Sequence, residues 1–429
     1  MSIWTDFGFR DNLYATPPLQ GTAEGSMLLV GRESEVSRLR THWGSLDTHA
    51  SMEGDNGVGK TSLVTVAAYR AMVAHGLGES DDLFLPLVEP FQLGTEGDFE
   101  EEVLFVIARS IIQYEAAFTA AGKKLPKLDD VRIWLDNPIL RGGGGGGSAL
   151  GFGANASYSQ SANSGGFSKS GFRDTVKQWL TSIFPDKSDG AFIGVIDNLE
   201  LLETSTEARR ALESMRDTVL ALPGVKWVLC GANGIVRSSV GSQRLTGVVG
   251  DPIQVAPLGT EDIPVVIERR IEANRLRADA IAPVEPLGFA HLYQVAGRNL
   301  RIALKHAQDF SIWLHGNNGP QLSSDDRLQL LEVWLAEQAS LYEADTSSLT
   351  PTGWNFFDSV LAFGGSCSPG EFAKFEFNST QAMRPYVKQL EDANLVHSTV
   401  DESDQRRRTI VVTANGWLVH YKRSGFSLA

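Results

Sequence analysis

Residues 54–61, Gly-Asp-Asn-Gly-Val-Gly-Lys-Thr, constrain the fold more than any other stretch of the chain. They fit the pattern G-x-x-x-x-G-K-[ST]. Glycines let the backbone turn sharply, so that successive N–H groups can point at one anion. The lysine adds a positive charge and the threonine adds a hydroxyl. We therefore predict a loop that binds the phosphate chain of a nucleotide.

The residues on either side of this loop support a strand–loop–helix arrangement. Residues 49–53 (HASME) can end a buried strand, and residues 61–73 (TSLVTVAAYRAMV) are apolar enough for a helix packed on a sheet. The N-terminus of that helix would add its dipole to the anion site. Lys60 would contact the β- and γ-phosphates and the Thr61 hydroxyl would bind Mg²⁺, so ATP and Mg²⁺ are the expected ligands.

A second motif supports a magnesium site. Residues 191–197 (AFIGVID) predict a buried strand that ends in Asp197. Such a strand carries a carboxylate to the sheet edge beside the phosphate loop, where it can hold Mg²⁺ through water. Many buried strands end in aspartate, so the prediction depends on the pairing with Lys60 and Thr61.

Residues 28–33 (LLVGRE), followed by an apolar-periodic stretch 34–43, resemble the box that precedes the phosphate loop in AAA+ ATPases of the origin-recognition and STAND type. A plain turn into a helix is the alternative interpretation. In that family the box lies against the adenine. The resemblance therefore implies a nucleotide contacted by Gly31, Arg32, Gly54, Asn56, Gly57, Val58, Gly59, Lys60, Thr61, Ser62 and Arg301.

The resemblance also implies roles for four further positions. Asn233, after a predicted strand 225–231, matches the polar residue that positions the attacking water, or is a turn residue before Gly234. Arg301, with Arg298 as second candidate, matches the lid arginine that reaches the γ-phosphate. The alternative is that it is a solvated arginine at the start of a helix. Arg237 and Arg244 are candidates for an arginine that acts on the nucleotide of a neighbouring subunit.

The expected fold class is α/β: a P-loop AAA+ core with a parallel sheet, a helical lid and a C-terminal winged-helix domain. The expected boundaries are 1–26 for an extended N-terminal arm without its own core, 27–256 for the core, 257–345 for the lid and connecting helix, and 346–429 for the winged helix. The core carries a Gly/Ser-rich insertion at 142–170. It is either a flexible surface segment or a small-residue hairpin that orders on a partner.

The sequence of the C-terminal unit is compatible with either DNA or protein as its partner. Helices followed by strands at 396–400 and 409–413 resemble a winged helix, with Arg406, Arg407 and Arg408 in the wing. Winged helices bind DNA in some families and protein in others. The formal net charge of the chain is −14, which does not favour nucleic acid without a local basic patch.

The remaining composition indicates a globular protein. The 429 residues are 42% hydrophobic and 21% charged, and the two cysteines, Cys230 and Cys367, do not indicate a disulfide framework. We expect neither a signal peptide nor a membrane span, and a cytoplasmic location.

The chain departs from the family pattern in one position that bears on catalysis. Active members usually carry glutamate after the strand-end aspartate, as the base that activates water, whereas Asn198 follows Asp197 here. An amide cannot accept that proton. We therefore expect an ATP-dependent, slowly hydrolysing switch that forms homo-oligomers, with DNA or an effector protein as partner. By analogy of architecture, its role would be in bacterial stress or anti-phage defence. The alternatives are a DNA-binding loader or transposition or replication regulator, and a non-hydrolysing ATP-bound scaffold.

Overall fold

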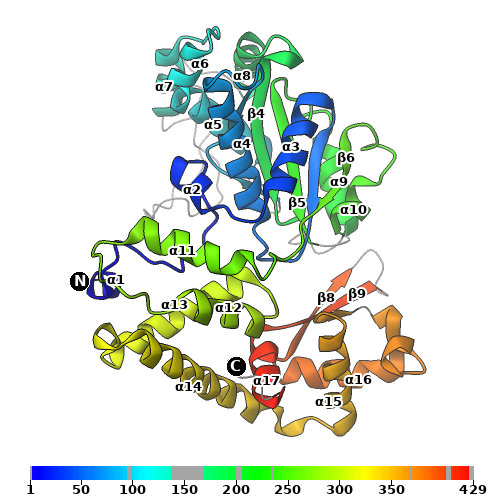
Figure 1. Ribbon diagram of the computed structural model, residues 1–429. Coiled ribbons are helices and arrows are strands. Elements are labelled where there is room, and N and C mark those ends of the chain that lie inside the picture. The colour runs from blue at the N-terminus through cyan, green and yellow to red at the C-terminus, as the bar shows by residue number, and fades with distance from the viewer. Residues whose placement is uncertain are drawn as a thin grey trace.

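The computed structural model describes residues 2–93, 98–136, 169–199, 205–232, 235–367, 369–401 and 407–424. Figure 1 shows an α/β core at the top, a helical layer below it, and a C-terminal unit of helices and a small sheet at the lower right, beside the helical layer. The expected insertion falls largely outside the described residues, which resume at Lys169. Asn233 and Arg406 lie outside them too.

The core is built on a parallel sheet whose strand order is β2-β4-β5-β1-β6, with β3 beside β4. The strands are β1 (His49–Glu53), β2 (Leu83–Pro86), β3 (Phe91–Gln92), β4 (Gly190–Asp197), β5 (Val225–Gly231) and β6 (Val249–Gln254). The phosphate loop follows the inner strand β1, and Asp197 ends β4, two strands away. Because the strands are parallel, both lie at the same edge of the sheet.

Both faces of this sheet are buried, as in other parallel sheets covered by helices. In β4, Phe192 and Ile196 face one hydrophobic core, whereas Ile193 and Val195 face another. The first core contains residues of α5, α7 and α8, and the second contains residues of α3 and α4. The core helices are α3 (Glu33–Ser45), α4 (Lys60–Gly76), α5 (Phe99–Gln113), α6 (Glu115–Ala120), α7 (Leu128–Asp136), α8 (Lys169–Ile183), α9 (Ser205–Met215) and α10 (Ile235–Val240).

The N-terminal segment carries two short helices, α1 (Ile3–Phe7) and α2 (Ala23–Leu28). It lacks a core of its own, but its aromatic side chains are buried in the core of the helical layer. Trp4, Phe7, Phe9 and Tyr14 are each 8% exposed or less. The expected extended arm is therefore an integral part of the helical layer. The domain boundaries drawn from the sequence stay a prediction.

The helical layer and the C-terminal unit complete the expected fold class, which is confirmed. The layer consists of α11 (Asp262–Asn274), α12 (Pro286–Val295), α13 (Leu300–Gly316) and α14 (Ser324–Glu343). The C-terminal unit has the element order of a winged helix, and its antiparallel sheet has the order β7-β9-β8. Its elements are α15 (Pro351–Ala362), β7 (Ser366–Cys367), a 3-10 helix at Pro369–Phe375, α16 (Thr380–Asp392), β8 (Val396–Asp401), β9 (Arg407–Val412) and α17 (Ala414–Ser424).

Cys230 and Cys367 lie in two different hydrophobic cores and form no disulfide, as the sequence predicts. Among the described residues, no helix is both long and apolar enough to span a membrane.

Candidate nucleotide-binding site

The phosphate loop lies between β1 and α4. Gly57 and Gly59 have φ values of 87° and 94°, a left-handed conformation that favours glycine. The Lys60 side chain is buried, with 6% exposure, and its Nζ donates to the carbonyl oxygens of Gly54 and Asp55 at 2.8 and 3.1 Å. The ammonium group therefore lies against the loop backbone, where a bound phosphate would be its next partner.

The Thr61 hydroxyl, in the first turn of α4, meets the Asp197 carboxylate at the end of β4. The Thr61 hydroxyl donates to Oδ2 of Asp197, and the Asn198 N–H donates to Oδ1 of the same carboxylate at 2.8 Å. Both Thr61 and Asp197 are 8% exposed. Hydroxyl and carboxylate oxygens are the ligands that Mg²⁺ takes in nucleotide sites, so this donor set fits the ion. The two residues expected to hold it are thus in direct contact.

These groups open into a cleft of about 870 Å³, measured to its open mouth. It is lined by residues 56–62 with Asp197 and Asn198, and by a largely apolar set of further residues. Ligand sites commonly combine apolar walls with a few polar groups. The apolar walls are Pro17, Pro18, Leu19, Leu28, Leu29, Val30, Leu258, Val266, Leu300 and Leu304.

The box at 28–33 reaches this cleft from the core side. Arg32 is 4% exposed, and it pairs with Glu35 at 3.0 Å and donates to the Val58 carbonyl oxygen at 3.0 Å. It therefore joins the box to the phosphate loop. Gly31 has a φ of 67°, and a carbon added there would lie 2.2 Å from Oδ2 of Asp262, so Gly31 packs against the start of α11.

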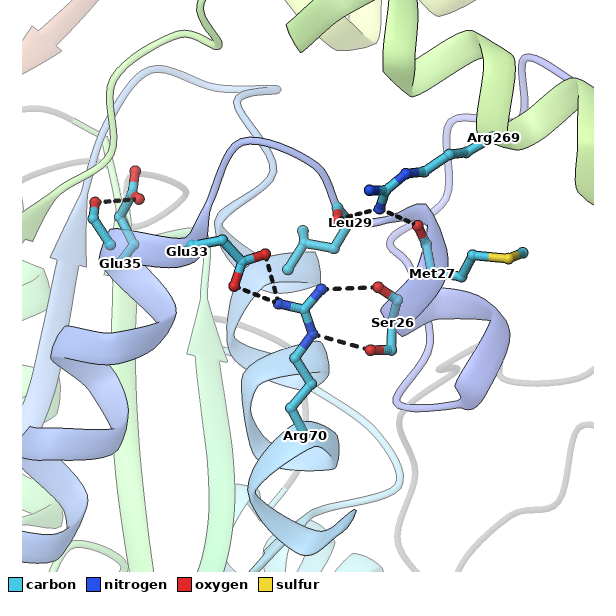
Figure 2. A network of polar contacts seen from close by, with 8 residues as sticks. Ser26, Met27, Leu29, Glu33, Glu35, Arg70 and Arg269 are labelled. Carbon is cyan, nitrogen blue, oxygen red and sulfur yellow. Dashed lines mark hydrogen bonds and ion pairs between the residues drawn. The ribbon is translucent and has the colours of Figure 1, made fainter. Parts of the chain in front are cut away.

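Helix α2, just before this box, is held from two sides (Figure 2). Arg70 of α4 donates to Glu33 at 2.9 and 3.0 Å, to Ser26 Oγ at 3.0 Å and to Ser26 O at 2.9 Å. Arg269 of α11 donates to the Met27 and Leu29 carbonyl oxygens at 2.6 and 3.3 Å. The apolar wall that starts at Leu28 is thus bonded to both the core and the helical layer.

Residues 13–19, which we name the N-terminal strap, form a wall that the sequence did not predict. Arg270 of α11 donates to the carbonyl oxygens of Leu13 and Ala15 at 3.1 and 2.9 Å. At its other end, the Leu19 N–H donates to Ser62 Oγ on α4 at 3.0 Å. Between these anchors, Thr16, Pro17 and Pro18 line the cleft. The strap therefore runs along the cleft from the helical layer to the core.

Arg270 is itself part of the cleft lining. Burial lowers its pKa from 12.5 to about 10, so the guanidinium stays charged at neutral pH. Pro17 and Pro18 are the one signal of the strap in the sequence, because proline favours an extended backbone. No pattern there indicates which helix would hold the strap.

The helical layer contributes Arg301, which lines the cleft from the first turn of α13. Arg298 is not among the lining residues, and its Nη2 donates to the Leu258 carbonyl oxygen at 3.4 Å. Whether Arg301 contacts a γ-phosphate stays a prediction.

The other two arginines predicted to act in catalysis are not among the residues that line this cleft. The Arg237 side chain is 66% exposed, and its Nε donates to the buried Glu53 carboxylate at 3.3 Å. Arg244 is exposed in the turn after α10. Asn233, the remaining predicted catalytic residue, falls outside the described residues.

No protein-family model and no curated protein matches this sequence. Solved structures give similar chains. One is the ORC1 protein of Aeropyrum pernix in complex with DNA, at 14% identity and a TM-score of 0.46, covering 97% of both chains. Another is the Walker-type ATPase PABY2304 of Pyrococcus abyssi, at 12% identity and a TM-score of 0.45, covering 95% of this chain and 99% of that one.

A third is the CDC6P protein of Pyrobaculum aerophilum, at 12% identity and a TM-score of 0.41, covering 98% of this chain and 100% of that one. At these values the fold class of this chain rests on its own motifs and strand order.

Proposed function

We propose that this chain is an ATP-binding, slowly hydrolysing switch of the AAA+ type, whose bound nucleotide sets its state of assembly. One observation carries the proposal: Lys60, the Thr61–Asp197 pair and Arg301 line a single cleft between the core and the helical layer. Lys60 would bind the β- and γ-phosphates, and Thr61 and Asp197 would hold Mg²⁺, which supplies charge neutralisation on the phosphates. Arg301 would approach the phosphates from the helical layer.

The central test is nucleotide binding by the Lys60→Ala variant. A charge-assisted contact contributes about 1.5–3 kcal/mol, so the Kd for ATP should rise at least ~10- to 150-fold. Lys305→Ala is the matched control, because Lys305 is an exposed lysine of α13 that pairs with Asp309 at 2.5 Å. Unchanged ATP affinity of Lys60→Ala by calorimetry would remove the proposal.

The slow turnover follows from Asn198. It lines the cleft beside Asp197 but offers no proton acceptor of the required strength. Loss of general-base help costs a factor of about 10² to 10⁴ in rate. A chain that binds ATP and releases no phosphate at all would be the non-hydrolysing scaffold instead.

Assembly is the proposed output, because a nucleotide shifts only an equilibrium whose two states it binds differently. Arg237 supports this part, since it is exposed on α10 and belongs to no wall of its own chain's cleft. Mass measurement with and without ATP tests it, and one mass in all nucleotide states would refute it. A role in bacterial stress or anti-phage defence is proposed by analogy of architecture alone.

The second candidate function is DNA binding through the C-terminal unit, in a loader or a regulator of transposition or replication. Arg384 and Lys388 support it, because they are exposed four residues apart on α16 and so share one face. Replacing both by alanine should weaken binding to duplex DNA and flatten its salt dependence. If the intact protein binds no DNA at low salt, with or without ATP, an effector protein is the remaining partner.

A further inference from the structure

The side chain of Asn299 makes two contacts at once. Its Oδ1 accepts from the Ile302 N–H at 3.2 Å, which caps the N-terminus of α13. Its Nδ2 donates to the Asn56 carbonyl oxygen in the phosphate loop at 2.7 Å. A single amide therefore starts the helix that carries Arg301 and also holds the loop that would bind phosphate.

The fit between α13 and the loop is close. A carbon added to Gly57 would lie 2.6 Å from Asn299 Oδ1 and 2.9 Å from Arg301 Cβ. Both distances are shorter than real carbon contacts, so the start of α13 rests directly on the loop backbone at Gly57. The hydrogen bond to Asn56 is thus one part of a contact surface between the helical layer and the loop.

The turn that presents Asn299 has an unusual backbone. Gly297 and Arg298 both adopt left-handed conformations, with φ values of 62° and 63°. A non-glycine residue pays for this conformation, so the surroundings must hold it in place. The Arg298 N–H donates to the Tyr293 carbonyl oxygen at 2.8 Å, which closes the turn from the α12 side.

The other side of this turn is covered by a residue of the last helix. A carbon added to Gly297 would lie 2.2 Å from Cε2 of Trp417, so the indole lies against the glycine backbone. The same ring lies against Gly365, whose φ is 82° and whose added carbon would be 2.5 Å from Cζ2. Trp417 of α17 therefore fills the space between the turn before α13 and the turn before β7.

Helix α17 is well placed to hold this ring still. Its Leu418 and Tyr421 are buried in the core of the helical layer, and its Val419 is buried in the core of the C-terminal unit. Tyr421 donates to Glu332 of α14, and Arg423 donates to both oxygens of Asp358 at 2.8 and 3.1 Å. Figure 1 shows α17 between α12 and the C-terminal helices.

We propose that Asn299 and Trp417 are positioning residues of the nucleotide site. Asn299 holds the phosphate loop in its binding shape, and Trp417 holds the turn that presents Asn299. The inference rests on the proposed function, since it assumes that residues 54–61 bind a nucleotide. Its consequence is that the C-terminal unit contributes to nucleotide affinity without touching the nucleotide.

The expected effect is a loss of preorganisation. Without the Asn299 bond, the loop must be ordered when the nucleotide binds, which weakens binding. One neutral hydrogen bond corresponds to a change of about 3- to 10-fold in Kd. The change should appear with ADP, because the loop holds the β-phosphate, and ADP also separates binding from hydrolysis.

Asn299→Ser is the first test variant. Serine caps helices about as well as asparagine but is too short to reach Asn56, and it adds no charge near the phosphates. We expect a Kd for ADP raised about 3- to 10-fold, with an unchanged thermal midpoint. Asn299→Ala, which loses the cap as well, should lower the midpoint in addition.

Trp417→Ala is the second test variant, and Trp417→Phe is the conservative substitution to compare with it. The alanine variant should raise the Kd for ADP by a similar factor, and the phenylalanine variant should restore most of the affinity. Phe377→Ala is the matched control, because Phe377 lies in the same unit and packs on Phe356 and Tyr386, with ring centroids 5.4 and 5.3 Å away, rather than on α17. It should lower the thermal midpoint and leave the Kd unchanged.

The outcomes separate the two levels of the argument. If the wild-type chain binds no ADP, the proposed function fails and the inference fails with it. If the wild type binds ADP and both Asn299→Ser and Trp417→Ala bind it equally well, only the inference is overturned. If Phe377→Ala weakens binding as much as Trp417→Ala, the role of Trp417 is overturned. Asn299→Ser removes no core atom, so it stays informative if Trp417→Ala does not fold.

Discussion

Besides its anchors at Arg270 and Ser62, the N-terminal strap is held by the buried hydroxyl group of Tyr14, and Tyr14→Phe tests this contact. Tyr14 has no exposed surface, and its hydroxyl donates to the Val284 carbonyl oxygen at 2.6 Å and accepts from the Val284 N–H at 2.8 Å. Burial raises the pKa of this phenol above its usual value, so the group stays protonated and can donate. Both bonds join the N-terminal segment to the chain just before α12.

The magnitude follows from what phenylalanine leaves behind. It keeps the ring, which stacks on Phe289 at 6.3 Å between centroids, so little apolar burial is lost. The Val284 N–H and carbonyl groups, however, lose their partner inside the core. A buried polar group left unsatisfied costs about 1–3 kcal/mol, so we expect a total of about 2–4 kcal/mol. For units of this size, that corresponds to a fall in Tm of about 5–12 °C.

Thermal unfolding by circular dichroism measures the effect. Tyr69→Phe is the control, because Tyr69 is half-buried on α4 and its hydroxyl makes no hydrogen bond with the residues that the structure describes. The Kd for ATP should also rise, since Tyr14 lies two residues before the strap's cleft-lining residue Thr16. A Tyr14→Phe protein whose Tm equals that of the control would show that the segment is not held as described.

Three further predictions address the chemistry of the site and the pH dependence of the fold. Wild-type turnover should stay below roughly 10 per second, the typical enzyme median. Asn198→Glu should speed phosphate release. It should also lower the stability by about 1–2 kcal/mol, because Asn198 has a φ of 55°. A wild type that hydrolyses faster than this limit would reveal another base. Asp197→Asn should abolish the gain in ATP affinity that Mg²⁺ gives over EDTA, whereas Thr61→Ser, which keeps the hydroxyl, should retain it. Burial lowers the pKa of His306 and of His49 from 6.5 to about 4, so the unfolded chain binds more protons than the folded one between these values. The free energy of unfolding should therefore fall as the pH drops through that window. In urea titrations at pH 7 and pH 4.5, His306→Leu should reduce this fall by about 2–3 kcal/mol. An equal fall in the wild type and the variant would contradict this.

Much of the fold was predictable because its signals are local. The glycine and lysine spacing of 54–61 predicts a phosphate-binding loop, and the apolar run before Asp197 favours a strand buried on both faces. The structure places these elements where the sequence predicts, with Lys60 against the loop backbone and Thr61 in contact with Asp197. Such features need only neighbours along the chain, so a single sequence is sufficient to recognise them.

The strap was not predictable in the same way. Trp4, Phe7, Phe9, Leu13 and Tyr14 are apolar enough to indicate burial, but residues 1–26 read as polar overall and carry Pro17 and Pro18. The groups that hold the segment to the helical layer, Arg270 and the backbone of Val284, lie more than 250 positions away in the chain. A contact of that separation leaves no periodic pattern in either segment. Composition alone therefore predicts an extended arm, whereas these residues form a wall of the cleft.

Asn299 shows the limit most clearly. As an asparagine before an apolar-periodic helix, it has the sequence signature of a helix cap, and the structure shows that cap. Its second contact, to Asn56, depends on where the folded core places Gly57, which has no side chain to obstruct the approach. The sequence pattern is satisfied by the cap alone and carries no trace of the contact with the loop. A residue whose local role is complete can thus hold a second, tertiary role, and only the arrangement in space separates this asparagine from any other helix cap.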